Sequence, residues 1–453
     1  MTPDLLDKYD VPAPRYTSYP TVPDWDKTPP EQEFWKEAVK RTFQETNLSD
    51  GISLYLHLPF CERLCTYCGC NTRITINHAV EKIYMAAIRS EWERYLALFD
   101  QKPRIKEIHL GGGTPTFFSP ENLGEMLGGI LKDAEVMPDR EFSFEAHPGN
   151  TSTGHLQVLY DQGFRRLSIG VQDFDPEVLE IINRFQTYED VVTLTENARR
   201  MGYESVNFDL VYGLPLQKQE QFMDTVRKVI DLRPDRIALY SYAHVPWVKP
   251  GQRKFSEADL PAREAKLKLY QGALECFTAS GYESIGMDHF ALPDDELCVA
   301  ARNGSLHRNF MGYTVNRTRL LIGLGASAIS DAGTGYVQNE KKVEDYYRAL
   351  KEREFPFFKG HQMSPLDQTI RKHILNLMCR MKTTWSDEDE GLSIIYQALE
   401  RLEDLESDGL VRIKPYELQV TETGKLFLRN ICMTFDPHLW AAGSQEKKFS
   451  RAV

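Results

Sequence analysis

The 453-residue sequence lacks the features that would place it in a membrane or direct its export. Its first twenty residues have neither the basic start nor the apolar run of a signal peptide. No stretch approaches the roughly 20 apolar residues that cross a bilayer, and no repeat or low-complexity tract stands out. We therefore expect a globular protein of the cytoplasm without a membrane span.

Positive charge is also scarce. The chain carries 54 Lys and Arg against 66 Asp and Glu, a formal net charge of -12. Nonspecific binding to nucleic acid or to anionic membranes needs an excess of positive potential. We therefore expect no nucleic-acid partner. Residues 391–430 have the pattern of a winged-helix DNA reader, but the acidic chain and the lack of a basic recognition stretch oppose that alternative.

Strand-like apolar runs alternate with helix-like segments in the first half of the chain. Helical patterns at 78–99, 120–132, 188–201 and 218–232 lie between six runs: SLYLHLPF (53–60), KEIHL (106–110), FSFEA (142–146), RLSIGVQ (166–172), SVNFDLVY (205–212) and RIALYSYA (236–243). This alternation predicts an α/β fold with parallel strands and helical crossovers. Six units fall short of the eight that close a barrel, so we expect a partial (β/α)6 TIM-like barrel.

Three parts of the chain differ in their pattern of apolar and polar residues. We predict an N-terminal segment that contacts substrate (1–45), the partial barrel with its extension (46–355), and a mostly helical C-terminal domain with a β-wing (356–453). Runs at 282–290 and 320–330 extend the sheet or cover its open edge. Helices are expected at 366–380 and 391–407, and the C-terminal domain is expected to close over the barrel mouth.

Four of the eight cysteines fall within ten residues, at Cys61, Cys65, Cys68 and Cys70, directly after a predicted strand. Short loops with this spacing let thiolates converge on an iron-sulfur cluster, and three ligands for four irons leave one iron open for a small chelating ligand. A zinc knuckle and buried structural thiols are the alternatives. Zinc sites usually have a second CxxC or an HxxxH pair, and none follows here.

Polar and glycine residues follow other strands of the predicted sheet. Gly111-Gly112-Gly113-Thr114-Pro115 is either a tight turn or a loop that approaches a ligand closely and exposes its N–H groups. Glu145, Gln172 and Asp209 lie near the C-terminal ends of their strands, where parallel α/β folds build active sites. Together they predict one pocket.

Beyond these motifs, segments along the whole sequence show that it resembles the oxygen-independent coproporphyrinogen III oxidases. These are radical S-adenosylmethionine (SAM) enzymes of heme biosynthesis. The agreement covers nearly the whole chain. It runs through PRYTSYPT (14–21), LYLHLPFC (54–61), CGCN (68–71), GGGTPT (111–116), GVQDF (170–174), FDLVYGLP (208–215), GMDHFA (286–291), DDEL (294–297), LHRNFMGYT (306–314), SAIS (327–330) and RNICMTFD (429–436).

The resemblance implies a ligand set. Cys61, Cys65 and Cys68 would hold a 4Fe-4S cluster, and Cys70 would be needed without being a ligand. One SAM would chelate the open iron and contact Tyr55, Tyr67, Gly112, Glu145 and Ile329. A second SAM would contact Gly113, Thr114, Gln172, Arg184, Asp209 and Ala243. Cys70, Tyr55 and Glu145 would be the catalytic residues.

The resemblance also implies the reaction. SAM is cleaved reductively, two propionates of coproporphyrinogen III become vinyl groups, and the product is protoporphyrinogen IX. A low-potential electron donor and a terminal electron acceptor, both unidentified, would be partners of a monomer. A substrate with four carboxylates attracts arginines, for which Arg15, Arg302 and Arg308 are candidates, each of them equally able to form an ordinary surface ion pair.

One loop departs from the family pattern. An Asp-Pro-Arg is expected after the glutamate of the third strand, but here Glu145 is followed by Ala146-His147-Pro148-Gly149-Asn150. His147 either replaces a polar substrate contact or makes a structural hydrogen bond. A heme chaperone and a heme-degrading radical SAM relative are the functional alternatives. The chaperones typically lack Cys70 and the RYTSYP segment, both of which are present here.

Overall fold

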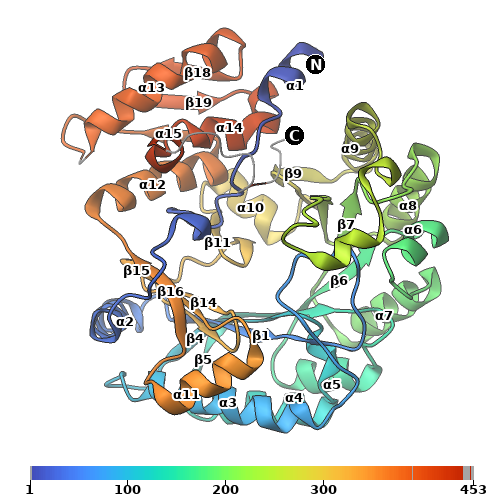
Figure 1. Cartoon of the computed structure of the whole chain (residues 1–453), viewed down its shortest axis with the longest axis vertical. Helices are drawn as coiled ribbons and strands as arrows, with labels where there is room; N and C mark the ends of the chain where they lie inside the picture. Colours follow the sequence, from blue (N-terminus) through green and yellow to red (C-terminus); the bar gives the residue numbers. More distant parts are fainter. Residues whose placement is uncertain (1–2, 390, 442–448, 450–453) are drawn as a thin grey trace.

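The centre of the fold is a run of six parallel strands (Figure 1). The structure is a computed structural model that describes residues 3–389, 391–441 and 449. The six strands lie side by side in chain order: β1 (Ile52–Leu58), β4 (Arg104–Gly112), β5 (Glu135–Ala146), β6 (Arg166–Gln172), β7 (Ser205–Tyr212) and β8 (Arg236–Ser241). All six predicted strands and the partial TIM-like barrel are therefore confirmed.

Helices connect these strands and bury their apolar faces against them. They are α3 (Val80–Leu96), α4 (Pro120–Leu131), α5 (Thr153–Asp161), α6 (Pro176–Ile181), α7 (Tyr188–Met201) and α8 (Gln219–Leu232). Local sequence sets their ends: the Ser119 side chain caps α4, Thr187 and Asp190 form a capping box on α7, and Gly202 ends α7 with a φ of 100°.

The sheet continues past both edges of this parallel core, as expected for 282–290 and 320–330. Beyond β1 lie β13 (Leu321–Leu324), β14 (Ile329–Asp331), β15 (Gly335–Asn339) and β16 (Phe357–Gln362); beyond β8 lie β10 (His289–Ala291) and β9 (Glu283–Gly286). β13 is parallel to β1, and the other added pairings are antiparallel. Two small pairs, β2 (Phe60–Cys61) with β3 (Arg73–Ile74) and β11 (His307–Asn309) with β12 (Gly312–Thr314), stand apart from the large sheet, and α9 (Arg263–Ala279), α10 (Glu296–Asn303) and α11 (Val343–Glu352) complete this part.

The C-terminal part has the predicted helices and β-wing. It contains α12 (Pro365–Arg380), α13 (Leu392–Ser407), α14 (Leu428–Met433) and α15 (Pro437–Ala441), with a small sheet in the order β17 (Lys382–Thr384), β19 (Glu417–Val420), β18 (Val411–Lys414). Within the described ranges, no helix is long and apolar enough to cross a membrane.

The N-terminal segment packs against both parts of the molecule. Trp35, Val39 and Phe43 of α2 (Gln32–Thr46) are buried in the core of the barrel, whereas Tyr16 and Tyr19 join the core of the C-terminal helices. Figure 1 shows α1 (Pro3–Tyr9) beside those helices. The segment therefore bridges the two cores. The division into three domains, with its two boundaries, stays a prediction.

Candidate active site

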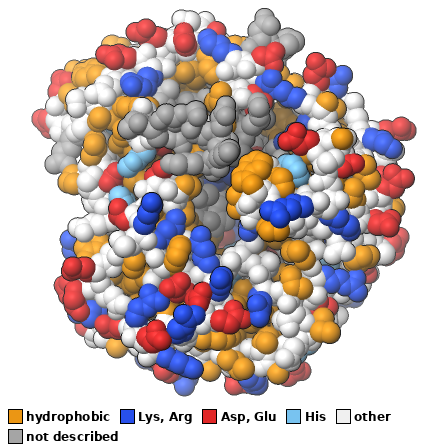
Figure 2. All heavy atoms as spheres, viewed as in Figure 1, with side chains coloured by type: hydrophobic (Ala, Val, Ile, Leu, Met, Phe, Trp, Pro, Cys, Tyr) orange, Lys and Arg blue, Asp and Glu red, His pale blue; other side chains and the backbone are white. Residues whose placement is uncertain are grey.

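A cavity of about 850 Å³ lies at the C-terminal ends of the parallel strands. This face of the molecule is hollowed near its centre, with Lys and Arg side chains along the rim (Figure 2). The predicted site residues that line the cavity are Cys61, Cys65, Tyr67, Cys68, Cys70, Gly112, Gly113, Thr114, Glu145, Gln172, Arg184, Asp209 and Ala243. Tyr55 and Ile329 are not among its lining residues. The Tyr55 hydroxyl forms a hydrogen bond with His57 Nδ1 at 3.0 Å, and Ile329 packs against the cluster formed by Trp25, Tyr336 and Met363.

The cysteine loop (residues 61–70) is hydrogen-bonded to the segment that follows α6. Asn183 Nδ2 donates to the Leu64 carbonyl at 2.7 Å, and the Thr66 N–H donates to the Ile182 carbonyl at 2.9 Å. Cys61, Cys65 and Cys68 are partly exposed and Cys70 is exposed, so the four are not buried structural thiols. The loop thus presents its thiols to the cavity.

The protonation of these thiols follows from their surroundings. Burial raises the pKa of Cys61 to about 12 and also raises that of Cys65, whereas a hydrogen bond from Cys70 lowers the pKa of Cys68 to about 7. Thiolates are the metal-binding form, so loading a cluster must release protons here. Among the described residues, no three His, Cys, Asp or Glu side chains converge on a single metal ion. A 4Fe-4S cluster does not require such convergence, because each thiolate binds a different iron atom. Three thiols on one wall of the cavity fit such a cluster.

Close packing requires glycine at Gly112, the last residue of β4, and at Gly113, which follows it. A Cβ on Gly113 would lie 2.6 Å from the Pro59 carbonyl, and one on Gly112, whose φ is 114°, would lie 2.7 Å from the His57 ring. The backbone N–H groups of both glycines form hydrogen bonds within the chain. Gly112 donates to Glu145 Oε2 at 3.1 Å, and Gly113 donates to the Leu58 carbonyl at 2.9 Å. The N–H groups of both glycines are therefore not free for a ligand, and the close approach seen here is to Pro59 and His57. That the loop also approaches a ligand stays a prediction.

Neighbouring side chains hold the carboxylate of Asp209 at the end of β7. Ser168 Oγ donates to Asp209 Oδ2 at 2.7 Å, and Asn207 Nδ2 donates to Asp209 Oδ1 at 2.9 Å. Burial raises the pKa of Asp209 to about 6. At neutral pH this carboxylate is mostly ionised and is oriented by two donors, which suits recognition of a cationic or hydroxyl-bearing ligand.

Gln172 and Arg184 are positioned by a break in strand pairing. The register between β6 and β7 shifts between Gly170 and Gln172, and Gln172 has a φ of 66°, a left-handed conformation that non-glycine residues rarely adopt. Arg184 is buried; it donates to the Gly170 carbonyl and to Gln186 Oε1, and its Nη1 lies 3.7 Å from Cys65 Sγ. One guanidinium therefore links the second predicted SAM site to the cysteine loop.

Sequence reasoning missed other lining residues, among them Ser168, Tyr240 and Gln252. Ser168 could have been found, because side chains two apart on a strand share a face and Ser168 precedes Gly170 and Gln172 at that spacing. Gln252 could not have been found, because it lies in a short 3-10 helix (Pro250–Lys254) whose position over the cavity the sequence does not define.

The loop that departs from the family pattern also lines the cavity. His147 Nδ1 accepts the N–H of Gly149 at 3.1 Å, and burial lowers the pKa of His147 to about 3. The ring is therefore neutral at physiological pH. Of the two predicted roles for His147, the structure shows the structural hydrogen bond.

The three candidate arginines differ sharply in surroundings. Arg15 forms an ion pair with Asp288. Arg302 is 49% exposed and pairs with Glu283 at 2.8 Å. Arg308 is 5% exposed and forms no ion pair with any described residue.

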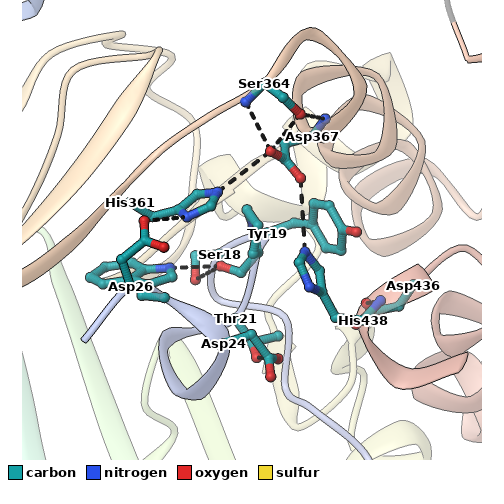
Figure 3. Close-up of polar contacts among 12 residues, drawn as sticks. Ser18, Tyr19, Thr21, Asp24, Asp26, His361, Ser364, Asp367, Asp436 and His438 are labelled. Carbon is teal, nitrogen blue, oxygen red and sulfur yellow. Dashed lines mark hydrogen bonds and ion pairs between the residues drawn. The ribbon is translucent and has the colours of Figure 1, made fainter. Parts of the chain in front are cut away.

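The N-terminal segment is tied to the C-terminal part by a chain of charged contacts (Figure 3). His361 of β16 lies between Asp26 of the segment, at 3.1 Å, and Asp367 of α12, at 3.4 Å. Asp367 also lies 3.9 Å from His438 of α15. Burial opposes protonation of His361, but Asp367 and Asp26 outweigh it and raise its pKa. The hydrogen bond with Asp367 raises the pKa of His438.

These contacts predict that the segment loosens at alkaline pH. A raised histidine pKa contributes stability below its unfolded value of about 6.5, and that stability is lost as pH rises through the folded value. Hydrogen exchange of residues 14–26, corrected for intrinsic rates, should therefore be faster relative to the core at about pH 9 than at about pH 6. His361→Gln should reduce this pH dependence. Equal protection at both values in the unmutated chain would contradict the prediction.

Comparison with known proteins agrees with this geometry. Residues 55–229 match the model of the radical SAM superfamily. The oxygen-independent coproporphyrinogen III oxidases of Salmonella typhimurium and Escherichia coli are each 38% identical to the chain, covering 99% of it and 98% of their own length. The solved structure of the Escherichia coli coproporphyrinogen III oxidase, described as a radical SAM enzyme, superposes with a TM-score of 0.88 at 39% identity, covering 94% of this chain and 97% of that one. The chain therefore belongs to the oxygen-independent coproporphyrinogen III oxidase family of radical SAM enzymes.

Proposed function

We propose that this chain converts two propionate side chains of coproporphyrinogen III into vinyl groups, giving protoporphyrinogen IX in anaerobic heme biosynthesis. Each conversion removes one hydrogen from the β-carbon, releases CO2 and passes one electron to an acceptor. The observation that carries the proposal is the meeting of three partly exposed thiols with Glu145 and Asp209 on one cavity, in a chain related to this family over its full length.

In the proposed site, Cys61, Cys65 and Cys68 hold a 4Fe-4S cluster with one open iron. A cluster of this kind with bound SAM supplies the 5′-deoxyadenosyl radical that takes the hydrogen. Tyr67, Gly112 and Glu145 line the wall next to the thiols and would contact the SAM on the open iron. Tyr55 and Ile329 belong to that proposed set as well, although they do not line the cavity.

We also propose that each chain binds a second SAM molecule. The residues proposed to contact it also line the cavity: Gly113, Thr114, Gln172, Arg184, Asp209 and Ala243. The carboxylate of Asp209 and the guanidinium of Arg184 supply complementary charges for an amino acid head group. The electron donor, the acceptor, the monomeric state and the cytoplasmic location stay predictions.

Asp209→Ala should weaken the binding of one SAM and leave the other. A hydrogen bond to a charged group contributes about 1.5–3 kcal/mol, so its loss weakens that site roughly tenfold to a hundredfold. Anaerobic equilibrium dialysis should find two SAM per unmutated chain and one in the variant, with iron content unchanged. Asp231→Ala, at an exposed position of α8, is the control. Two tightly bound SAM in Asp209→Ala would show that Asp209 is no contact, and one in the unmutated chain would end the two-site proposal.

The function is tested with anaerobically reconstituted protein, SAM, a low-potential reductant and an electron acceptor. Coproporphyrinogen III should disappear, a three-carboxylate intermediate should pass through, and the oxidised product should run as a dicarboxylic porphyrin on chromatography. SAM consumption should follow vinyl formation. Stoichiometric heme binding without decarboxylation would favour a heme chaperone instead.

A further inference from the structure

The outer side of the cysteine loop joins two other segments of the chain in one surface. Asn183 Nδ2 donates to the Leu64 carbonyl at 2.7 Å, and Gln252 Nε2 donates to the Tyr67 carbonyl at 3.2 Å. Loop residues therefore contact both the segment after α6 and the segment after β8. We call the surface formed by residues 62–66, 183–185 and 247–254 the loop face.

Large apolar side chains of the loop face are open to solvent. Leu64, Phe185, Trp247 and Val248 are 40, 56, 57 and 59% exposed. Beneath them Tyr242 and Phe255 belong to a buried cluster against which Tyr67 packs, so the face rests on a packed support. Figure 2 shows hydrophobic side chains beside the hollow, with Lys and Arg next to them. Exposed apolar groups that gather in this way mark interaction sites, and aromatic residues are enriched in protein interfaces.

The charge of the loop face is opposite in sign to that of the whole chain. Its basic side chains are Arg63, Lys249, Arg253 and Lys254, and none of the four forms an ion pair with a described residue. In the three segments the only acidic residue is Glu62, although the chain as a whole has a formal net charge of -12. An acidic partner is therefore attracted to this face and repelled by most of the remaining surface.

Part of the loop face points away from the cavity. Lys249 and Gln252 line the cavity, whereas Trp247, Arg253 and Lys254 of the same segment do not. The segment thus has one side toward the cavity and one toward solvent. A small ligand held in the cavity leaves that outer side uncovered, so its apolar and basic groups fit a protein that docks from outside.

We propose that the loop face docks a small acidic protein that carries one electron at low potential. This rests on the proposed function, in which each cleavage of SAM consumes one electron. The carrier is oxidised by one electron, which passes through the cluster to SAM, where one sulfur–carbon bond breaks to give methionine and the 5′-deoxyadenosyl radical. The proposed ligands lie on the loop that forms the face, so the path is short, and electron transfer slows steeply with distance. Electron-transfer encounters use small interfaces, below about 1,200 Å², which a face of this kind can supply.

The test compares two reductants of the reconstituted holoenzyme: reduced flavodoxin, an acidic flavoprotein, and excess sodium dithionite. In the double variant Arg253→Glu/Lys254→Glu, the second-order rate constant for cluster reduction by flavodoxin should fall roughly tenfold or more at low salt. The difference should shrink at about 1 M salt, where the screening length is only about 3 Å. Trp247→Ser should weaken the binding of flavodoxin roughly tenfold or more, because interface tryptophans contribute strongly. With dithionite, both variants should reach full cluster reduction and cleave SAM as the unmutated protein does.

The matched control is Arg199→Glu/Arg200→Glu, which makes the same change in charge at exposed positions of α7 and should keep the flavodoxin rate within about twofold. Binding of oxidised flavodoxin, measured by calorimetry at two salt concentrations, gives a readout independent of turnover. Equal binding and reduction in all variants would overturn the proposal, as would no flavodoxin binding by the unmutated protein. A raised KM for coproporphyrinogen III with dithionite would assign the face to the substrate and also overturn it. Flavodoxin binding without SAM cleavage by dithionite-treated protein would reject the proposed function and leave the docking face standing.

Discussion

Cys61→Ser, Cys65→Ser and Cys68→Ser are each expected to abolish the broad visible absorption of the reconstituted cluster, and all reductive cleavage of SAM with it. Cys61, Cys65 and Cys68 lie on one loop that Asn183 holds in place, and each proposed ligand that is lost leaves one iron of the cluster without its thiolate. A hydroxyl is a far weaker ligand for iron than a thiolate. Iron and sulfide analysis with an anaerobic absorption spectrum measures the result for each variant.

Cys276→Ser is the control for these variants. Cys276 lies on α9, away from the cavity wall, and packs against the barrel core. Its spectrum and its rate of SAM cleavage should match those of the unmutated protein. Full iron content and full SAM cleavage in any one of the three loop variants would show that the ligand assignment is wrong.

The fold could be predicted largely because its signals are local. Each barrel strand is a short apolar run bounded by turns, and the helices between them carry caps such as Ser119 and Gly202. The added strands were harder to assign. β13 pairs with β1 across more than 250 residues of chain (Ser53 with Leu321), and no local pattern specifies such a partner.

The site was predictable where residues share a strand end and less so elsewhere. Glu145, Gln172 and Asp209 reach one cavity because parallel strands end at one edge of the sheet. The occupied N–H groups of Gly112 and Gly113 could not be foreseen, since their acceptors come from other strands. That Arg308 forms no ion pair with any described residue depends on how β11, β12 and α12 pack together, which the sequence does not reveal.

Cys70→Ser is expected to keep the cluster and lose the product. The Cys70 N–H donates to Cys68 Sγ at 3.4 Å, and Lys249 Nζ donates to the Cys70 carbonyl at 3.1 Å, so the thiol is held beside a proposed ligand on the cavity wall. Neither backbone contact needs the sulfur, so the loop should keep its shape in the variant.

The loss of product follows from the role that the family resemblance gives this thiol, near the reacting carbon and outside the coordination sphere. If it transfers a proton or a hydrogen, its removal should slow vinyl formation roughly a hundredfold or more. The decisive measurements are made on one preparation: iron content, the absorption spectrum, SAM cleavage without substrate, and porphyrin product by chromatography. The first three should match the unmutated protein while the fourth falls. Lost iron would instead make Cys70 a ligand, and an unchanged product yield would remove it from the chemistry altogether.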